Sequence, residues 1–328
     1  MVMKNWFRNS AIAVIAGVLL GAAPFGVAQA HNSYPSRTIT FVCAFPAGSG
    51  ADVLVRYFAD KVTKLAGQAV IVENKPGAMS NIAAEYTARA KPDGHTIFVH
   101  SGNAIAGNMW MLKKPPIDVT RDLNTIATIN KQAFMITVRK DSPYQTLADL
   151  TAAMKQKGEN GSYAVNTTSG KVLVEEYKQK AGLNTIVVQY KSAPDSLNDM
   201  MSGQVDFGVH DPVFALSQIR AGRWRALAIG SEERMAGAPD VPTFKEQGID
   251  IVQLGWWGAM VPANVPADVT ATINGWFNEI LARPETKTFL EQQGGDVYIA
   301  TPGQAQALMV STVAQWKGLV EVAKIPQQ

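Results

Sequence analysis

Two short runs of small residues have the composition of anion-binding loops, because small side chains let an anion approach the backbone closely. The first is PAGSGAD at 46–52 and the second is NTTSGK at 166–171. Each follows an apolar run and precedes a helical pattern, so its N–H groups would lie at a helix N-terminus, where they lack intrahelical partners. Two such loops facing each other across a cleft would hold the two ends of a small acid. The candidate residues are Ala47, Gly48, Ser49, Gly50 and Asp52 from the first loop, and Asn166, Thr167, Thr168, Ser169, Gly170 and Lys171 from the second.

The first loop does not match the glycine-rich loop that binds dinucleotides. That fingerprint is G-x-G-x-x-G, and here Gly48 and Gly50 are followed by Val53 where the third glycine is required. A phosphate loop of the form G-x-x-x-x-G-K-[ST] does not occur either. A simpler alternative remains, in which each loop is only a well-capped turn and Asp52 caps the helix. The similar positions of the two loops in two α/β units favour binding.

No combination of residues forms a recognisable catalytic or metal centre. His95, His100 and His210 are far apart along the chain, and the sequence has neither an H-E-x-x-H nor a G-x-S-x-G motif. Cys43 is the only cysteine, which excludes an intrachain disulfide and a cysteine metal cluster and predicts a buried, inert thiol. A polar contact or a structural role explains the histidines more simply than catalysis. We therefore expect no enzyme, no cofactor and no metal.

The first thirty residues have the three parts of a secretory signal peptide. Lys4 and Arg8 give a positive start, an apolar run covers 11–27, and AQA at 28–30 is a small-x-small cleavage site. We expect cleavage after residue 30, with an uncleaved membrane anchor as the alternative. Residues 1–30 contain no acid, so cleavage removes two positive charges and changes the formal net charge from +3 to +1. Such a small net charge argues against nucleic acid as a partner. Export of a protein without disulfides is typical of the bacterial periplasm.

The apolar periodicity predicts two α/β units. The first has strands at 38–45, 69–74 and 95–101, alternating with helices at 52–66 and 81–90. The second has strands at 133–140, 161–166, 185–190, 204–209 and 224–231, with helices at 146–156, after 170 and at 196–203. Two amphipathic helices, at 267–281 and 302–323, follow. Strands alternating with helices are typical of a doubly wound sheet.

The segment GWWGAMVP at 255–262 concentrates aromatic residues and has two interpretations. The favoured one is a packing cluster in the core or between domains. The other is an aromatic wall that stacks on a ligand. If Phe45 or Trp256 stands at such a wall, the cleft would accept a flat acid such as an aromatic dicarboxylate.

Several of these segments together resemble the substrate-binding receptors of tripartite tricarboxylate transporters, also called the Bordetella uptake gene family. The stretch YPSRTITFVCAFPAGSGADVLVRYFADKV at 34–62 is similar to the start of that family, with Arg56 in the helix after the loop. Similar blocks follow in order through the mature chain. They are VIVENKPGA at 70–78, KPDGHTIFV at 91–99, GQVDFGV at 203–209, IRAGRWRALAIGS at 219–231, PDVPTFKEQGI at 239–249 and WWGAMVPANVP at 256–266.

The resemblance implies an α/β fold of the type II periplasmic binding protein kind, with two lobes, a ligand cleft between them and two hinge strands near 126–138 and 255–261. Lobe one would comprise 31–131 plus 254–328, and lobe two 132–253. A small di- or tricarboxylate, aromatic or not, would bind in the cleft. The site residues that the resemblance implies are Phe45 to Asp52 in the first loop, Ser101 and Asn103 after the third strand, Asn166 to Gly170 in the second loop, and His210 and Asp211 at the border of the cleft.

Two departures from the family pattern concern the loops. Gly48 and Ser49 stand where the family usually has two glycines, and the second loop has Lys171 and no histidine. Lys171 is therefore a candidate cationic partner for a distal carboxylate. The resemblance implies a monomeric receptor that delivers its ligand to the membrane subunits of a tripartite tricarboxylate transporter. The alternatives are an exported hydrolase that uses His100 or His210, and a receptor that presents its closed form to a signalling partner.

Overall fold

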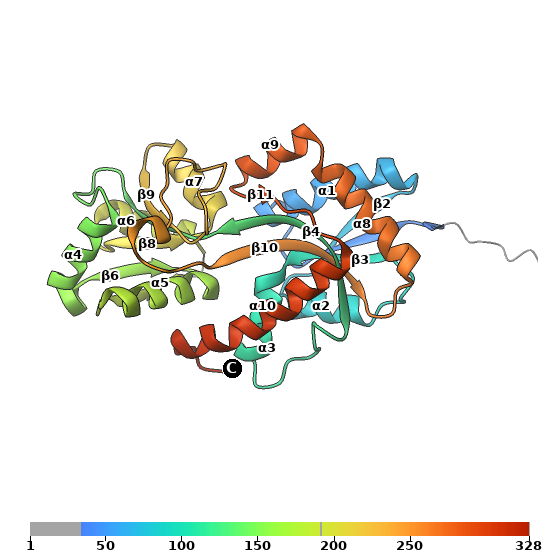
Figure 1. Ribbon diagram of the computed structural model, residues 1–328, viewed down its shortest axis with the longest axis horizontal. Coiled ribbons are helices and arrows are strands. Elements are labelled where there is room, and N and C mark those ends of the chain that lie inside the picture. Colours follow the sequence, from blue (N-terminus) through green and yellow to red (C-terminus); the bar gives the residue numbers. More distant parts are fainter. Residues whose placement is uncertain (1–33, 191, 328) are drawn as a thin grey trace, which may run out of the picture. The chain divides into compact units, whose positions relative to one another are not determined.

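The structure is a computed structural model, and it describes residues 34–190 and 192–327. The predicted signal peptide at 1–30 lies outside the described residues. From residue 34 onward the chain forms one compact unit that contains two β-sheets. Figure 1 shows the two sheets with their helices. No helix in the described part of the chain is long and apolar enough to cross a membrane.

The first sheet has six strands in the order β11-β4-β10-β3-β1-β2. Its strands β1, β2 and β3 are parallel, whereas β10 runs antiparallel to β3 and β4. Its strands are β1 (Ile39–Cys43), β2 (Val70–Asn74), β3 (Thr96–Ser101), β4 (Leu123–Ala133), β10 (Leu254–Pro262) and β11 (Asp296–Val297). Its helices are α1 (Gly50–Ala66), α2 (Asn81–Ala88), α3 (Gly102–Met111), α8 (Ala267–Leu281), α9 (Pro284–Gln292) and α10 (Pro302–Val322).

The second sheet has five strands in the order β7-β6-β8-β5-β9, with β5 antiparallel to both of its neighbours. Its strands are β5 (Met135–Arg139), β6 (Ser162–Val165), β7 (Ile186–Gln189), β8 (Phe207–His210) and β9 (Trp224–Ile229). Its helices are α4 (Leu147–Lys157), α5 (Thr168–Ala181), α6 (Leu197–Ser202) and α7 (Pro212–Arg220). Short 3-10 helices lie at Ala78–Ser80, Gly158–Asn160, Pro194–Ser196 and Lys245–Gln247.

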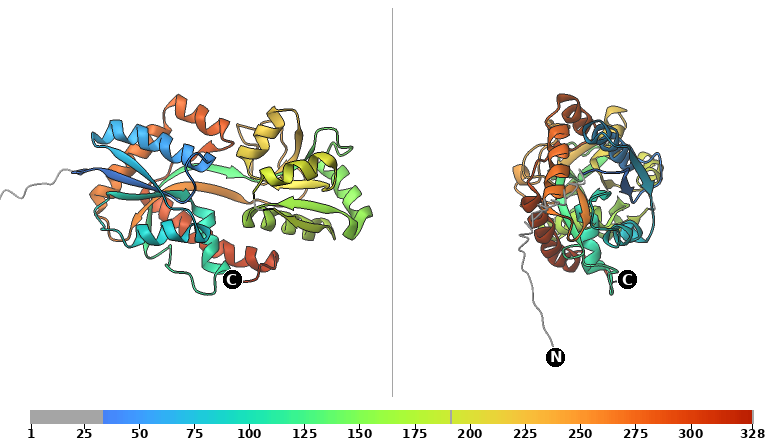
Figure 2. Two further views of the ribbon diagram at one scale, coloured as in Figure 1. Left: turned by 180° about the vertical axis from the view of Figure 1, so that it is seen from behind. Right: turned by 90° about the vertical axis from the view of Figure 1, so that its right-hand side faces the viewer.

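Each sheet is covered by helices on both faces, as the buried strands require (Figure 2). In β1, Phe41 belongs to the core under α1, α8 and α9, while its neighbour Val42 belongs to the core under α2, α3 and α10. The alternation arises because successive strand side chains point to opposite faces. Phe58 of α1 is fully buried in the first core, which contributes roughly 1.5–3 kcal/mol. In the second sheet the cores lie under α4 and α5 and under α6 and α7.

Two neighbouring crossings connect the sheets. The chain leaves the first sheet at the end of β4 and enters the second at β5 after only Phe134. It returns to the first sheet through β10, which pairs with β4 along its whole length. The two-lobed α/β fold is therefore confirmed, and we use lobe one and lobe two for the first and second sheets with their helices. The lobe boundaries drawn from the sequence stay a prediction.

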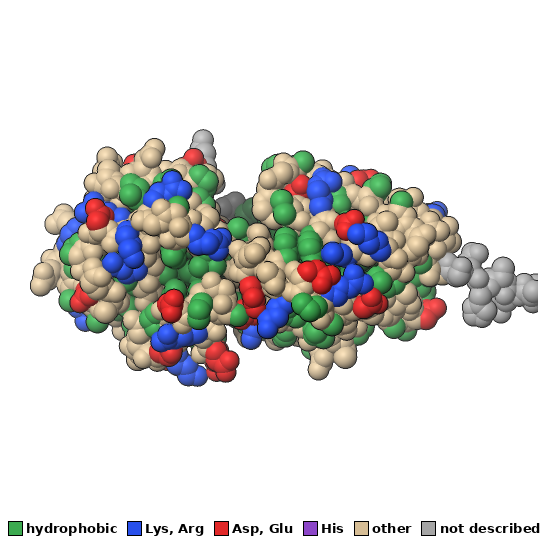
Figure 3. Space-filling view, turned by 90° about the horizontal axis from the view of Figure 1, so that it is seen from above, with side chains coloured by type: hydrophobic (Ala, Val, Ile, Leu, Met, Phe, Trp, Pro, Cys, Tyr) green, Lys and Arg blue, Asp and Glu red, His purple; other side chains and the backbone are tan. Residues whose placement is uncertain are grey.

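The surface carries charges of both signs. Figure 3 shows Lys and Arg side chains interspersed with Asp and Glu side chains on one face of the molecule. Several of these charges form ion pairs one helical turn apart, such as Lys64 with Asp60 and Arg283 with Glu279. Exposed pairs of this kind contribute about 0.3–0.5 kcal/mol each, so they support solubility more than the fold.

Candidate binding site

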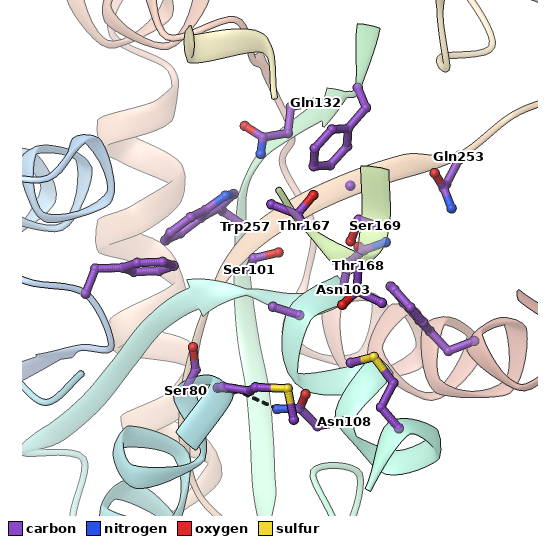
Figure 4. Close-up of a pocket in the computed structure, with 17 residues that line it drawn as sticks. Ser80, Ser101, Asn103, Asn108, Gln132, Thr167, Thr168, Ser169, Gln253 and Trp257 are labelled. Atoms are coloured by element: carbon purple, nitrogen blue, oxygen red, sulfur yellow. Dashed lines mark hydrogen bonds between the residues drawn. The ribbon is translucent and has the colours of Figure 1, made fainter. Parts of the chain in front are cut away.

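A cavity of about 300 Å³ lies between the two lobes, and 17 residues line it. Figure 4 shows that polar side chains from both lobes point into it, with Ser101 and Asn103 from lobe one and Thr167 to Ser169 from lobe two. The lining residues are Phe45, Met79, Ser80, Ser101, Asn103, Ala104, Asn108, Met111, Gln132, Phe134, Thr167, Thr168, Ser169, Gln253, Gly255, Trp257 and Trp316. The site therefore belongs to neither lobe alone.

Three helices begin at this cavity. Helix α2 starts after Ser80, α3 after Ser101 and α5 after Thr167, and all three of these N-cap residues line the cavity. The first N–H groups of a helix have no intrahelical acceptor and carry partial positive charge. Within the described chain, the N–H groups of Asn103 and Ser169 have no hydrogen-bond acceptor. The cavity thus presents unpaired backbone donors from both lobes.

The α5 N-terminus is built by its own cap. Thr167 has an extended backbone, and its Oγ1 accepts a hydrogen bond of 3.1 Å from the N–H of Gly170. This bond uses the third N–H group of the helix and leaves the N–H groups of Thr168 and Ser169 available. The small residues of the second loop therefore leave the backbone at the start of α5 open to close approach.

The α2 N-terminus is held in an unusual backbone conformation. Ala78, Met79 and Ser80 have φ values of 46°, 51° and 72°, in the left-handed region that favours glycine. Such conformations cost about 1–3 kcal/mol each and persist only where the surroundings impose them. Here Asn108 Nδ2 donates to the Met79 carbonyl at 2.8 Å, and Asn81 Nδ2 donates to the Ala78 carbonyl at 2.8 Å. The strained turn carries Met79 and Ser80, and both residues line the cavity.

The cavity contains no formal charge, because none of the described residues that line it is acidic or basic. Three of the residues that line it carry buried polar atoms that lack hydrogen-bond partners. They are Asn103 Oδ1, both amide atoms of Gln253, and Trp316 Nε1, on side chains that are 9%, 8% and 1% exposed. A buried polar atom without a hydrogen bond costs about 1–3 kcal/mol. A polar ligand that bonds to these atoms would remove that cost.

Aromatic and thioether side chains form the apolar walls. Phe45 and Trp257 face the cavity with ring centroids 6.0 Å apart, and Phe134 and Trp316 also line it. The aromatic segment at 255–262 combines the two roles considered above, with one tryptophan packed in the core and the next one in the cavity wall. Trp256 is buried in the core of lobe one, where its Nε1 donates to Thr312 Oγ1 at 3.0 Å, whereas its neighbour Trp257 lines the cavity. The division follows from strand alternation in β10.

The first loop is organised by Asp52, which is 2% exposed. Its carboxylate accepts hydrogen bonds from the Gly48 N–H at 2.8 Å, Arg56 Nε at 2.8 Å and Asn74 Nδ2 at 2.7 Å. The bond from Arg56, with those from Asn74 and Gly48, lowers the pKa of Asp52 to about 2 against the cost of burial. Ser49 caps α1 by accepting from the Asp52 N–H. The loop therefore uses several of its polar groups to hold its own structure.

Only Phe45 of the first loop lines the cavity. Ala47, Gly48, Ser49, Gly50 and Asp52 are outside the lining, and a Cβ built on Gly50 would lie 3.8 Å from Val213 Cγ1 at the start of α7. This part of the loop thus faces lobe two beside the cavity. A role of these residues in ligand binding stays a prediction.

His210 and Asp211 lie inside lobe two and outside the cavity lining. The imidazole of His210 is 1% exposed and lies between Thr137 Oγ1, 2.9 Å from Nδ1, and Ser196 Oγ, 3.0 Å from Nε2. Burial lowers the pKa of His210 to about 3, so the ring is neutral at pH 7. Asp211 caps α7 by accepting from the Phe214 N–H at 3.0 Å, and burial raises its pKa.

His100 lies directly behind two walls of the cavity. It is fully buried against Phe98, Phe45 and Trp257, with ring centroids 4.9, 5.2 and 5.5 Å away. Neither ring nitrogen has a hydrogen-bond partner, and burial lowers the pKa of His100 to about 3. It supports Phe45 and Trp257 but does not line the cavity.

The structure brings together only part of the predicted site. Phe45, Ser101, Asn103, Thr167, Thr168 and Ser169 line one cavity, whereas Asn166, Gly170 and Lys171 stand next to it without lining it. Sequence reasoning missed Gln132, Phe134 and Gln253, which lie where the chain crosses between the lobes. The expected hinge strand at 126–138 was a signal for Gln132 and Phe134, whereas Gln253 lies just before the one expected at 255–261. Within the described residues, no group of three His, Cys, Asp or Glu side chains could hold a metal ion.

Comparison with known proteins agrees with this architecture. A family model described as "Tripartite tricarboxylate transporter family receptor" matches residues 54–325. The chain is 31% identical to a UPF0065 protein of Bordetella bronchiseptica, over 95% of this chain and 92% of that protein. It is 26% identical to the protein BugT of Bordetella pertussis, over 93% of this chain and 95% of that protein.

A solved structure described as the periplasmic binding protein BugD is similar in fold as well as sequence. It matches with a TM-score of 0.75 and 27% identity, and the match covers 90% of this chain and 100% of that one. The periplasmic binding protein fold expected from the sequence is thereby confirmed. The chain belongs to the family of tripartite tricarboxylate transporter receptors and is a solute-binding receptor.

Proposed function

We propose that the protein is a periplasmic receptor that captures a small organic carboxylate between its lobes and delivers it to a tripartite tricarboxylate-type membrane transporter. The observation that carries this proposal is the convergence of three helix N-termini on a cavity without charged side chains. Unpaired N–H groups and helix dipoles both favour an anion there. Delivery to the transporter and the absence of catalysis are parts of the proposal that the family alone supports. Action as a monomer is a further part of the proposal.

Preorganised neutral donors can hold a carboxylate without a cationic side chain. Each helix N-terminus contributes about 0.3–1 kcal/mol, and up to about 2 kcal/mol in a partly buried geometry. Hydrogen bonds from backbone N–H groups to an ionised carboxylate contribute about 1.5–3 kcal/mol each. The apolar walls of Phe45, Phe134 and Trp257 would bury the carbon skeleton of the acid. A hydrolase that uses a cleft histidine has no support from this geometry, since no histidine is among the described lining residues.

One substitution tests the backbone donors without altering a side-chain charge. Thr168→Pro removes the first N–H of α5, and proline at this position suits a helix start. The chain already begins α7 and α10 with Pro212 and Pro302. Because Thr167 has φ −134° and ψ 154°, its backbone tolerates a following proline. We expect the affinity for the best-bound acid to fall roughly 10- to 100-fold, from the loss of one charge-assisted hydrogen bond.

The matched control is Ala267→Pro, which makes the same change at the exposed start of α8, outside the cavity. Pro266 has ψ 145°, so it also tolerates a following proline. Isothermal titration against mono- and dicarboxylates, aliphatic and aromatic, measures both variants, with thermal unfolding as the check on folding. Unchanged affinity in a folded Thr168→Pro variant would contradict the assigned role of α5. No binding of any acid by the ligand-free wild type would contradict the proposed function.

A further inference from the structure

A second cavity of about 290 Å³ adjoins the first, in the groove between α5 of lobe two and α10 of lobe one. The two cavities share Asn103, Gln253 and Trp316, which form the partition between them. We call the second cavity the distal chamber. Beyond the partition it is lined by Glu176 of α5 and by Gln315 and Leu319 of α10, with the turn before β10.

The partition carries the unpaired polar atoms described above. Gln253, 8% exposed, has neither its amide oxygen nor its amide nitrogen bonded, and Asn103, 9% exposed, has an unbonded Oδ1. The Asn103 amide nitrogen already donates to the Leu254 carbonyl at 3.2 Å. In the view of Figure 4, Gln253 lies at the margin of the main cavity, beyond Ser169. Two buried acceptor oxygens therefore lie where the main cavity meets the distal chamber.

The only charged residue among the described residues that line the distal chamber is Glu176. Its side chain is 21% exposed, and its nearest cation is Lys180 Nζ at 3.9 Å, at the limit of an ion pair. Burial raises the pKa of Glu176, the charge of Lys180 opposes this shift, and the charge of Asp250 adds to it. Within the described chain, the only counter-charge paired with the carboxylate is therefore Lys180, at the outer limit of an ion pair. A second carboxylate on a ligand would be repelled here, and a cation would be attracted.

We infer that the distal chamber receives an ammonium group at the far end of the ligand, so that the receptor takes amino acids whose amine is remote from the carboxylate. This inference rests on the proposed carboxylate site at the helix N-termini. An ammonium group has three donors and no acceptor. The residues that line the chamber carry the Glu176 carboxylate and the buried, unbonded oxygens of Asn103 and Gln253. The ligand is then a zwitterion, and its two charged ends meet donors and acceptors respectively.

The helix itself sets the length of such a ligand. Thr168, at the first position of α5, and Glu176 are eight residues apart, which is roughly 12 Å along the axis at about 1.5 Å per residue. Helical side chains lean toward the N-terminus, so the Glu176 carboxylate reaches back along α5. The distance left between the start of α5 and this carboxylate is roughly 8–10 Å. An extended aminohexanoate with its amine on the terminal carbon fits this span, whereas an α-amino acid is too short to reach both ends.

Titration calorimetry of ligand-free protein with hexanoate, adipate and ω-aminohexanoate tests the inference. The three acids have the same chain length and differ at the far end, which is apolar, anionic or cationic. We expect ω-aminohexanoate to bind at least 10-fold more tightly than either of the others. In Glu176→Gln this preference should fall to less than 3-fold. Glu321→Gln, which removes an exposed carboxylate from α10 outside the chamber, should keep the full preference.

The outcomes separate this inference from the function on which it rests. Equal binding of hexanoate and ω-aminohexanoate, or tighter binding of adipate, overturns the inference and leaves the carboxylate site intact. A preference for ω-aminohexanoate that persists in Glu176→Gln also overturns it, because the cation would then be recognised elsewhere. If none of the three acids binds, the carboxylate site itself is contradicted and the inference falls with it.

Discussion

Replacing Asp52 by asparagine tests whether the first loop is held together by a buried carboxylate. The side chain is 2% exposed and accepts from Gly48, Arg56 and Asn74, while Arg56 is 49% exposed. The substituted asparagine would retain the size of the side chain but lose the charge and one acceptor oxygen. The free energy of unfolding should therefore fall in the Asp52→Asn variant, and the loss should depend on pH.

The magnitude follows from the pKa of Asp52, which is lowered from 3.8 to about 2 in the folded protein. At about 1.4 kcal/mol per pKa unit, the folded state gains about 2 kcal/mol at pH 7, and somewhat less because Arg56 is half exposed to solvent. A carboxylate whose pKa is lower in the folded state stabilises above its unfolded pKa. That contribution is lost as the pH falls from about 4 through 2, with about half remaining at pH 3.

Urea unfolding of both proteins at pH 7, 5, 4 and 3 measures this difference. We expect a wild-type advantage of about 1–2 kcal/mol at pH 7 and 5 that shrinks by about half at pH 3. Arg56→Gln, which removes the cation and leaves the carboxylate, should reduce the same pH dependence. A difference between wild type and Asp52→Asn that stays constant from pH 5 to 3 would refute the assignment of the stabilisation to the ionised carboxylate.

Two further predictions concern side chains behind the cavity. His100→Leu should make the free energy of unfolding less sensitive to acid. The pKa of His100 is about 3 in the folded protein and 6.5 ordinarily, so the wild type loses stability as the pH falls from 6.5 toward 3. An unchanged slope of the unfolding free energy against pH between 6.5 and 4.5 would count against this assignment. Gly102→Ala should destabilise the protein by about 1–3 kcal/mol in urea unfolding, since its Cβ would overlap the Trp256 ring in a close-packed core. Gly275→Ala, where a Cβ meets nothing within 4 Å, is the matched control and should not destabilise.

Sequence reasoning recovered the features that depend on local pattern. The strand at β1, the small loop before α5 and the amphipathic helices α8 and α10 follow from apolar periodicity and capping residues, which act over a few positions. In the second loop, Thr167 to Ser169 line the cavity, and a Thr cap followed by small residues leaves the first N–H groups of the helix available in any context.

Features that depend on packing between distant segments could not be read in this way. The choice between Trp256 and Trp257 is set by which face of β10 meets α10, and this choice depends on the register with β4. The partition residue Gln253 has no motif, and its importance arises because both of its amide atoms are buried without partners. Asp52 was expected as a helix cap. Its bond to Arg56 lies one turn away within α1, but its bond to Asn74 requires the neighbouring strand β2.

The most direct test of the central claim is a crystal structure of the protein with the tightest-binding acid of the titration panel. We expect the carboxylate between the lobes, with its oxygens within about 3 Å of the N–H groups of Thr168 or Ser169 on α5 and of Asn103 on α3. No Lys or Arg side chain should contact it. A carboxylate paired with Lys171, or bound outside the cavity between the lobes, would contradict recognition by the helix N-termini.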